Sequence, residues 1–522
     1  MSTHAGTVEQ HRTRTTVLIG LVSTTVLLLR MFVPGPVGLS DQGDGHRLLC
    51  QLGLANDVAW NVSQSSFVRF TWVSHVFYGE TCGANGTGQP VYSSQLLLDR
   101  IATWLTPVLG LPGSLDLRAL AVLCCVVAGA AVGWLVHEMR GARFARVVVG
   151  VVVTLILADS GIAVYFASPY SEGGAFLGLL LLLPASLRLL HSRRTSLAAI
   201  VTVLAIGTFV LASKTQMVTF LPLLLLVLLV RPGQRVTGGQ VAGQPRWRTA
   251  RVRRRAAGSL ACLGLVGVVV ATLSAEPPRF QELHVYKQVF LTILPGSPDP
   301  TGDLQFFGLD PSLARGSGID INGPGSVVTD PAYAGFTDKV TSAKVVEFYL
   351  THPARTVGLV HQGLDYAATF RLSSYLASYP EASGNPAGTA DHRVEVLTEV
   401  FTVFKALPLL LLIVWIVGLV RFSVAARRGS CAGLLGLGLT LSIVTQFGAV
   451  LLSEGYAEAI KHMIVVDYAT ALMFPVAIMV WTERRARRSF DRPGTSTTVS
   501  TPFVRTELSD LPARDRVLPD TP

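Results

Sequence analysis

The segment TTVLIGLVSTTVLLLRMFVPGPVGLSDQGDGHR, residues 15–47, decides the fold class. Residues 15–34 are mostly apolar, and a helix of about 20 such residues is long enough to span a lipid bilayer. Pro34-Gly35-Pro36 then breaks the helix, and the small residues of a signal-peptide cleavage site do not follow it. We therefore expect a retained span, preceded by a cytoplasmic segment 1–14 and followed by an acidic loop.

The composition of the whole chain indicates a polytopic membrane protein. Half of its 522 residues are hydrophobic, only 15% are charged, and the mean hydropathy is +0.48. This balance excludes an ordinary soluble enzyme. We predict an all-α protein with about ten transmembrane helices, near residues 15–34, 117–136, 147–167, 174–190, 196–212, 216–230, 256–275, 401–420, 431–452 and 463–482.

The net charge of +10 reflects membrane topology rather than nucleic-acid binding. Arginines concentrate in alternate loops, such as residues 140–146, 231–255 and 484–488, as expected for cytoplasmic segments. The predicted topology therefore places both termini inside, and we expect no nucleic-acid partner. All six lysines fall on the predicted outer side: Lys214, Lys287, Lys339, Lys344, Lys405 and Lys461.

The chain reads as one integral membrane domain, residues 15–482, with two long outer loops at 35–116 and 276–400. We expect amphipathic helices on the membrane surface within these loops, at Arg47–Leu54, at Leu96–Leu109, and at Ser342–Ala367 with a break at His352-Pro353. Residues 483–522 are expected to form a disordered cytoplasmic tail.

The six cysteines carry little information about function. Cys50 and Cys82 share the first outer loop, where an oxidising compartment would permit a disulfide. The remaining cysteines lie in apolar segments and read as small core residues.

The acidic loop after the first span has the composition of a catalytic site. Asp41 and Asp44 could bind a divalent cation, Mg²⁺ or Mn²⁺, or one of them could act as a general base. His46 and Arg47 could contact a phosphate. The alternative is a solvated loop whose acids only follow the outside-acidic trend.

Other predicted outer turns contain similar residue types. Tyr170 could stack on a sugar, and Glu172 beside it would be costly to bury without a partner. Lys214 lies at a hairpin tip, where it could hold a lipid phosphate or reach the headgroups. On a helix, Glu454, Glu458 and His462 share one face beside Lys461. Helix capping or interfacial anchoring would explain each of these turns equally well.

Two acids lie inside predicted spans. Asp159 and Asp467 need a partner there and are functional candidates for that reason. The other spans are nearly free of charge, which counts against a transporter or flippase.

The candidate residues share the predicted outer side, where nucleotide sugars and ATP are normally absent. The chain also has no P-loop and no dinucleotide-binding fingerprint. A polyprenyl-phosphate sugar in the outer leaflet is the activated donor that suits such a location.

Five motifs together resemble a known superfamily. They are Asp41-Gln-Gly-Asp-Gly-His-Arg47, Leu294-Pro-Gly-Ser-Pro-Asp-Pro300, Phe307-Gly-Leu-Asp-Pro311, Phe348-Tyr-Leu-Thr-His-Pro353 and Ala459-Ile-Lys-His462. With an acidic motif directly after the first helix, the chain resembles the GT-C superfamily of polyprenyl-phosphate-dependent glycosyltransferases. It looks most similar to bacterial membrane hexose transferases of S-layer and cell-surface glycan biosynthesis.

The resemblance implies roles for individual residues. Asp41 or Asp44 would be the catalytic base or a metal ligand, and Glu172 would correspond to a second acidic site. Basic residues that hold the lipid phosphate would correspond to Lys214, Lys461 or His462. The spacing here is Asp-x-x-Asp, whereas the superfamily commonly has Asp-x-Asp or Glu-x-Asp, so a metal does not follow from the motif.

We therefore expect a transferase of the bacterial plasma membrane whose active site faces the extracytoplasmic side. It would move a hexose from a polyprenyl-phosphate donor to a cell-surface glycan or lipid-linked acceptor, with membrane lipids around it. Besides the divalent cation named above, we expect no cofactor. An O-antigen-type glycan polymerase or ligase is the enzymatic alternative, and a lipid or solute transporter is the alternative of another class.

Overall fold

The computed structural model describes residues 2–56, 65–74, 91–192, 196–230, 245–370, 376–456 and 458–491. Within them, seven helices are long and apolar enough to cross a membrane. A bent pair would make an eighth span if it is counted as one, and it consists of α5 (Arg143–Ala158) followed by α6 (Ser160–Ala163) and the 3₁₀ turn Val164–Ala167. The seven are α1 (Ser2–Phe32), α4 (Leu117–Glu138), α7 (Glu172–His191), α10 (Pro245–Ser274), α17 (Pro408–Arg427), α18 (Cys431–Ser453) and α19 (Ala459–Asp491).

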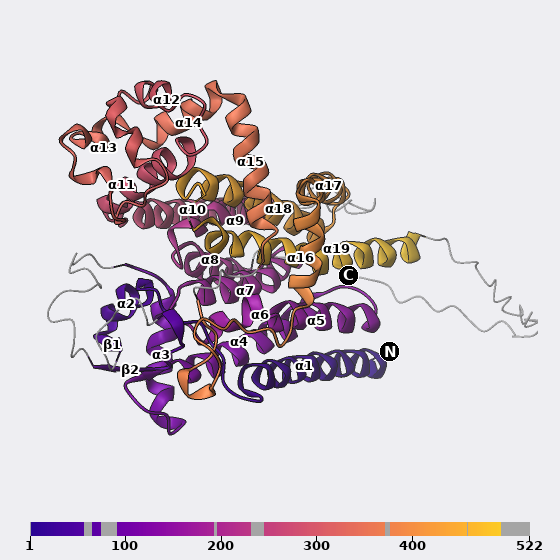
Figure 1. Cartoon of the computed structure of the whole chain (residues 1–522). Helices are drawn as coiled ribbons and strands as arrows, with labels where there is room; N and C mark the ends of the chain where they lie inside the picture. The colour runs from indigo at the N-terminus through magenta and orange to yellow at the C-terminus, as the bar shows by residue number, and fades with distance from the viewer. Residues whose placement is uncertain are drawn as a thin grey trace, which may run out of the picture.

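The two ends of the helix bundle are different. The helix α1 begins and α19 ends on the same side (Figure 1). On the opposite side lie α2 (Asp44–Leu49), α3 (Gln95–Val108) and a lobe that contains α11 (Pro278–Tyr286) to α14 (Ser342–Thr351) (Figure 1). We call this opposite side the loop end of the bundle.

The expected spans correspond to helices in the structure, with two differences. The segments 196–212 and 216–230 form the short helices α8 (Leu197–Leu211) and Thr215–Leu229, the latter a 3₁₀ turn followed by α9 (Leu221–Leu229). The first is about 22 Å long and the second about 25 Å, and both are shorter than the hydrocarbon core of about 30 Å. The predicted number of ten spans is therefore not confirmed.

The prediction of a span at 401–420 was wrong in position. One helix, α16 (Val396–Ala406), ends there and α17 begins at Pro408, because proline fits the first turn of a helix and not its interior. At the other end of the expected membrane domain, α19 continues past residue 482 to Asp491. The expected tail is therefore helical over 483–491, and residues 492–522 lie outside the described part.

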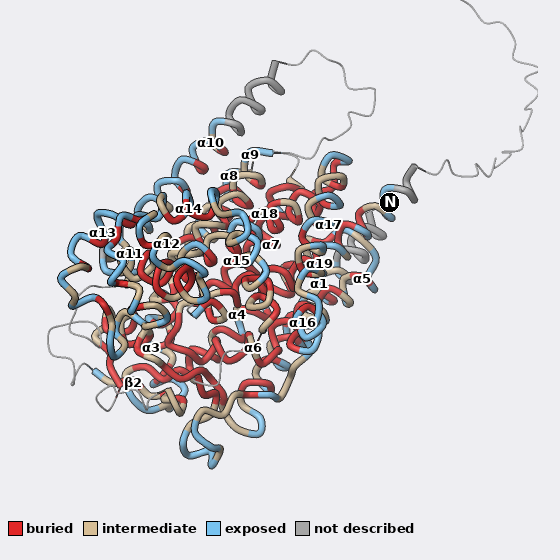
Figure 2. The backbone as a smooth tube through the Cα atoms, turned by 45° about the horizontal axis from the view of Figure 1, so that its top comes forward, coloured by how far each residue is buried: buried red, intermediate tan, exposed pale blue. Residues whose placement is uncertain are grey.

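Small residues bring α1 and α4 into close contact. A Cβ on Gly129 would lie 2.0 Å from Thr24 Oγ1 and 2.7 Å from the carbonyl oxygen of Gly20. Such close approach of backbones is how helices pack in lipid, where no hydrophobic force drives them together. Figure 2 shows buried residues in the centre of the bundle and exposed ones on its outer helices, where large apolar side chains such as Leu21, Leu260 and Ile413 face outward.

The first long loop contains a small sheet that the sequence did not predict. Its three antiparallel strands are β1 (Leu54–Asn56), β2 (Thr71–Ser74) and β3 (Leu115–Asp116), in that order. The helix expected over Arg47–Leu54 ends early, because α2 passes into a 3₁₀ turn at Cys50–Leu52 and Gly53 reverses the chain with φ 71°. The second expected helix is α3, with Leu97, Trp104 and Val108 exposed.

The second long loop is mostly helical. It contains α11, a π-helical turn at Lys287–Ile293, α12 (Pro300–Phe306), α13 (Phe336–Lys339), α14, α15 (Pro353–Ala367) and α16, with 3₁₀ turns at Pro311–Gly316, Val327–Thr329, Pro331–Tyr333 and Glu381–Ser383. The break predicted at His352-Pro353 is confirmed, since α14 ends at Thr351 and α15 begins at Pro353.

Asp159, one of the two intramembrane acids, holds the end of this loop against the bundle. Its carboxylate accepts hydrogen bonds from the backbone N–H groups of Gly161, at 3.0 Å, and Leu397, at 2.7 Å, and from Thr398 Oγ1 at 3.2 Å. Asp159 thus caps both α6 and α16, which is a structural role. For Asp467, neither carboxylate oxygen has a hydrogen-bond partner within the described residues.

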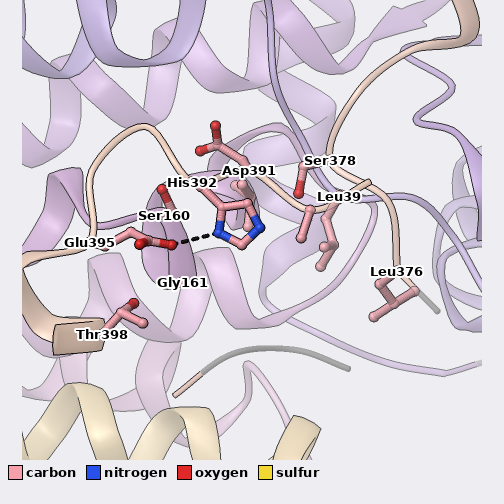
Figure 3. A pocket seen from close by; sticks show the side chains of 11 residues that line it. Leu39, Ser160, Gly161, Leu376, Ser378, Asp391, His392, Glu395 and Thr398 are labelled. Carbon is pink, nitrogen blue, oxygen red and sulfur yellow. Dashed lines mark hydrogen bonds and ion pairs between the residues drawn. The ribbon is translucent and has the colours of Figure 1, made fainter. Parts of the chain in front are cut away.

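A second buried contact fixes the same loop. The Asp391 carboxylate pairs with Arg30 of α1 and accepts a hydrogen bond from Tyr379 Oη at 3.0 Å. Beside it lies a cavity of about 30 Å³ between the loop and α6. Figure 3 shows side chains that line it, Ser160 and His392 among them. This volume suits about one water molecule, so the cavity belongs to the packing of the loop.

The cysteines that the structure describes match the expectations from the sequence. Cys124, Cys125, Cys262 and Cys431 are free and buried. Cys50 is disulfide-bonded. Cys82, its expected partner, lies outside the described residues.

Asp99 of α3 gives a stability prediction. It is fully buried, and only its Oδ1 has a partner in the described part of the chain, the Nε2 of Gln95 at 2.9 Å. Burial raises the pKa of Asp99 to about 7, although the Gln95 hydrogen bond lowers it. Because the folded-state pKa lies above the unfolded value, the folded protein loses stability as the pH rises from about 4 to about 7.

Asp99→Asn removes this loss. At pH 8 the variant should be more stable than the wild type by on the order of 2–4 kcal/mol, and at pH 4 the difference should nearly vanish. Thermal unfolding of the detergent-solubilised protein at both pH values measures the effect. An equal shift at pH 4 and pH 8 would contradict the assignment.

Candidate functional site

Charged side chains from widely separated parts of the chain meet at the loop end. They come from α2, from the first turn of α7, from the turn after α8, from the π-helical turn, from the α18–α19 connection and from the first turn of α19. We call this group the loop-end cluster, and it consists of Asp44, Glu172, Lys214, Lys287, Glu454, Glu458, Lys461 and His462.

Asp44 and Lys461 form the pair that joins the first loop to the last span. The Lys461 Nζ lies 2.6 Å from Asp44 Oδ2 and 4.9 Å from the centre of the Tyr170 ring. The Lys461 side chain is only 3% exposed, whereas that of Asp44 is 45% exposed. Desolvation alone would raise the pKa of Asp44, but Lys461 and Arg47 hold it well below its usual value. Asp44 is therefore an ionised carboxylate at the solvent-facing rim.

Glu172, Lys214 and His462 form the second part of the cluster. Lys214 Nζ lies 2.6 Å from Glu172 Oε1 and 3.1 Å from His462 Nδ1. The other ring nitrogen of His462, Nε2, lies 3.5 Å from Glu454 Oε1. The buried Glu172 thus has a cationic partner, as its position beside the membrane requires.

Lys287 forms the third part, between two glutamates. Its Nζ lies 2.7 Å from Glu454 Oε2 and 2.9 Å from Glu458 Oε2. Burial alone would lower the pKa of Lys287, but the two carboxylates raise it above its usual value. Glu458 also accepts a hydrogen bond from Gln42 Nε2 at 3.1 Å, so the cluster closes back onto the loop after α1.

The backbone at Glu458 is strained. Its φ is 51°, the left-handed region that a residue with a Cβ seldom adopts. Strain of this kind tends to occur where the surrounding structure holds a functional side chain in place.

Asp41 and His46 are buried next to Asp44 and have a structural role in this arrangement. The Oδ1 of Asp41 accepts hydrogen bonds from the N–H groups of Gly43 and Gly45, both at 2.9 Å, and its Oδ2 lies 2.5 Å from His46 Nδ1. The buried His46 ring packs on Trp72 with their centres 4.8 Å apart. Asp41 thus holds the first turn of α2 and so orients Asp44.

Arg47 and Tyr170 border the cluster. Arg47 reaches Asp44 Oδ1 at 3.3 Å and lies over the Phe280 ring of α11, 5.7 Å from its centre. The Tyr170 hydroxyl accepts a hydrogen bond from the Gln42 backbone N–H at 2.9 Å. Burial raises the pKa of Tyr170 well above its usual value, so this phenol stays protonated.

The geometry does not favour a cation shared by Asp41 and Asp44, because the oxygens of Asp41 already accept backbone and histidine hydrogen bonds. Ligand atoms of Glu454, Glu458 and His462 lie within 4.8 Å of one another. However, the Lys287 ammonium contacts both glutamates and neutralises them in place of an ion. A divalent cation therefore stays a prediction and has no part in the proposal below.

Sequence reasoning placed most of the cluster but missed two contributions. Lys287 was noted only as one of the outer lysines, and Glu454 only as part of a helical pattern. The signal that could have found Lys287 is the concentration of lysine on the predicted outer side, since three of these lysines belong to the cluster.

Lys287→Met tests whether the cluster holds the loop end together. The substitution leaves Glu454, whose side chain is 4% exposed, without its nearest cation. Removing one partner of a buried ion pair costs about 3–5 kcal/mol. We expect a lower unfolding temperature in detergent, while Lys339→Met, at an exposed position of the same lobe, should leave it unchanged. Equal unfolding temperatures for both variants would show that the pair does not stabilise the fold.

Comparison with known proteins identifies one family. Residues 6–496 match the family model described as the YfdI N-terminal transmembrane domain. No curated protein and no solved structure matches the chain.

Proposed function

The chain belongs to the family of YfdI N-terminal transmembrane domains and is an integral membrane protein, and we propose that it is a membrane glycosyltransferase. It transfers a hexose from a polyprenyl-phosphate donor to a cell-surface glycan or lipid-linked acceptor. In this proposal the protein has a GT-C-like fold in the bacterial plasma membrane, and its loop end faces the extracytoplasmic side.

The observation that carries the proposal is the contact between Lys461 and Asp44 at the rim of the loop end. A lysine that can hold a phosphate and a carboxylate that can accept a proton lie side by side, next to the apolar bundle from which a lipid donor would approach. Lys214 of the same cluster offers a second ammonium group at a partly exposed position. Lysine binds a phosphate as a compact point charge.

The reaction forms one carbon–oxygen bond, breaks another and transfers one proton. The acceptor hydroxyl oxygen bonds to the anomeric carbon of the hexose, and the bond from that carbon to the phosphate oxygen breaks. The hydroxyl proton passes to Asp44, and the polyprenyl phosphate leaves with the bonding electrons. Lys461 and Lys214 stabilise its charge, as preorganised cations do for developing negative charge.

Donor binding would also activate the base. With Lys461 2.6 Å away, the Asp44 carboxylate is a weak base because its pKa is low. A phosphate that draws Lys461 toward itself raises the pKa of Asp44 toward its usual value. Asp44 then accepts the proton only when the donor is present, which limits unproductive chemistry.

A glycan polymerase or ligase is the second candidate, and Lys287 favours it. Proteins of that class depend on basic residues of a long late loop, and here that loop supplies Lys287 to the cluster. Single-sugar polyprenyl phosphates and oligosaccharide polyprenyl pyrophosphates, offered separately as donors, distinguish the two activities.

Asp44→Asn tests the proposal. We expect transfer from a polyprenyl-phosphate hexose, measured per folded protein, to fall by about 10²-fold or more, as when a general base is removed. The unfolding temperature should also fall, because the buried Lys461 ammonium loses its carboxylate partner. Radiolabelled hexose transferred by purified protein in lipid nanodiscs measures it.

Two further variants serve as controls. Asp41→Asn should lower stability as well as activity, since Asp41 holds the first turn of α2. Asp338→Asn, at an exposed site of the loop-end lobe, should change neither property. Full activity of Asp44→Asn would rule out Asp44 as the base.

A further inference from the structure

The loop-end lobe contains a cavity that the cluster does not use. Its volume is about 850 Å³, within the range of about 300–1,000 Å³ typical of ligand pockets. One wall is α11, and the other is formed by the turn at 321–322, Val328 and the residues 337–343 that lead into α14. In Figure 1 these elements lie together in the lobe beside the bundle.

The helix α11 separates this cavity from the loop-end cluster. Gln281, Glu282 and Val285 line the cavity. On another face of the same helix, Phe280 lies under Arg47, and His284 Nδ1 lies 3.5 Å from Glu454 Oε1. Lys287, which directly follows α11, joins the cluster itself. Whatever occupies the cavity is therefore one helix away from Asp44 and Lys461.

The chemistry of the lining suits a neutral, hydroxyl-rich ligand. Arg279 and Glu282 carry opposite charges, and Gln281, Asn322, Thr341 and Ser342 add groups that donate and accept hydrogen bonds. Val285 and Val340 provide apolar surface between them. A sugar presents the same combination, with hydroxyls at its edge and C–H groups on its faces.

Some of these polar groups are already oriented. Arg279 Nη2 donates to Asn322 Oδ1 at 3.1 Å, and Tyr333 Oη donates to Glu282 Oε1 at 3.0 Å. The Tyr333 ring in turn stacks on Phe336, with ring centres 4.7 Å apart. Held in this way, the polar groups lose little freedom when a ligand binds.

We propose that this cavity binds the acceptor, as a neutral oligosaccharide of the glycan to which the hexose is added. The inference rests on the proposed function, because only a transferase needs an acceptor beside its donor site. The balanced charges argue against a phosphate or another anion as the occupant. The donor phosphate belongs instead at the lysines of the cluster.

The test measures binding of labelled gluco-, galacto- and manno-trisaccharides to the purified full chain in nanodiscs. Ala343→Trp fills the cavity from an exposed position, and Gln281→Ala removes a hydrogen-bonding group at another. Val346→Trp is the matched control, because Val346 is exposed on the same helix, α14, and does not line the cavity. Binding of polyprenyl phosphate is measured in parallel.

The wild type should bind at least one trisaccharide, and Ala343→Trp should weaken that binding at least about tenfold, a change of about 1.4 kcal/mol. Gln281→Ala should weaken it less, and Val346→Trp should not affect it. Binding of polyprenyl phosphate should be unchanged in all three variants. No trisaccharide binding by the wild type, or equal binding by the wild type and both cavity variants, would overturn the proposal.

The same variants separate this inference from the proposed function. Asp44→Asn should lower transfer by about 10²-fold or more and keep trisaccharide binding. If Asp44→Asn retains full transfer while Ala343→Trp loses the trisaccharide, the glycan site stands and the role of Asp44 fails. If transfer depends on Asp44 but no trisaccharide binds, the transferase stands and the cavity is not its acceptor site.

Discussion

A lysine ammonium removed from water must lie against a carboxylate, and the loop end of this protein is built on that requirement. The side chains of Lys461 and Lys287 are only 3% and 5% exposed, and each contacts at least one carboxylate below 3 Å. Leaving either charge unpaired there would cost several kcal/mol. The pairs join the first loop, the last span and the π-helical turn, so these segments can pack only together.

The sequence predicts the apolar helices well because lipid demands long stretches without charge. The sequence-based predictions fail where the chain departs from a regular hydrophobic repeat. Pro408 divides an apolar run that hydropathy alone treats as continuous, and Gly53 ends an expected helix early, so that its last residue lies in β1. The small sheet was invisible because its strands are too short for a recognisable alternation.

In the candidate site, too, the sequence alone does not reveal the role of some single residues. Asp41 and Asp44 are chemically identical in the sequence, and only the turn between them decides their roles. Gly43, with φ 112°, directs the backbone N–H groups at Asp41 and leaves Asp44 facing Lys461. Asp159 likewise reads as a functional intramembrane acid until its helix-capping hydrogen bonds are seen. Lys287 is positioned by a π-helical turn, which has no reliable sequence signal.

The geometry also gives a reason why the loop-end cluster uses lysine rather than arginine. An ammonium group on a flexible stem can lie between two carboxylates that point at it from different segments, as Lys287 does with Glu454 and Glu458. A planar guanidinium instead holds its donors in a rigid fork. Arg30, which pairs with Asp391 and donates to Ser160, shows that the chain uses arginine where a fixed buried arrangement is needed.

The two faces of α11 give the protein a way to vary one property without disturbing another. Residues 281, 282 and 285 line the cavity, whereas residues 280, 284 and 287 contact the charged side chains of Arg47, Glu454 and Glu458. On the two proposals above, divergence along this helix would retune which acceptor is recognised while the charged centre stays intact. In the language of evolvability, selectivity and chemistry would then lie on separate, independently mutable surfaces of one short element.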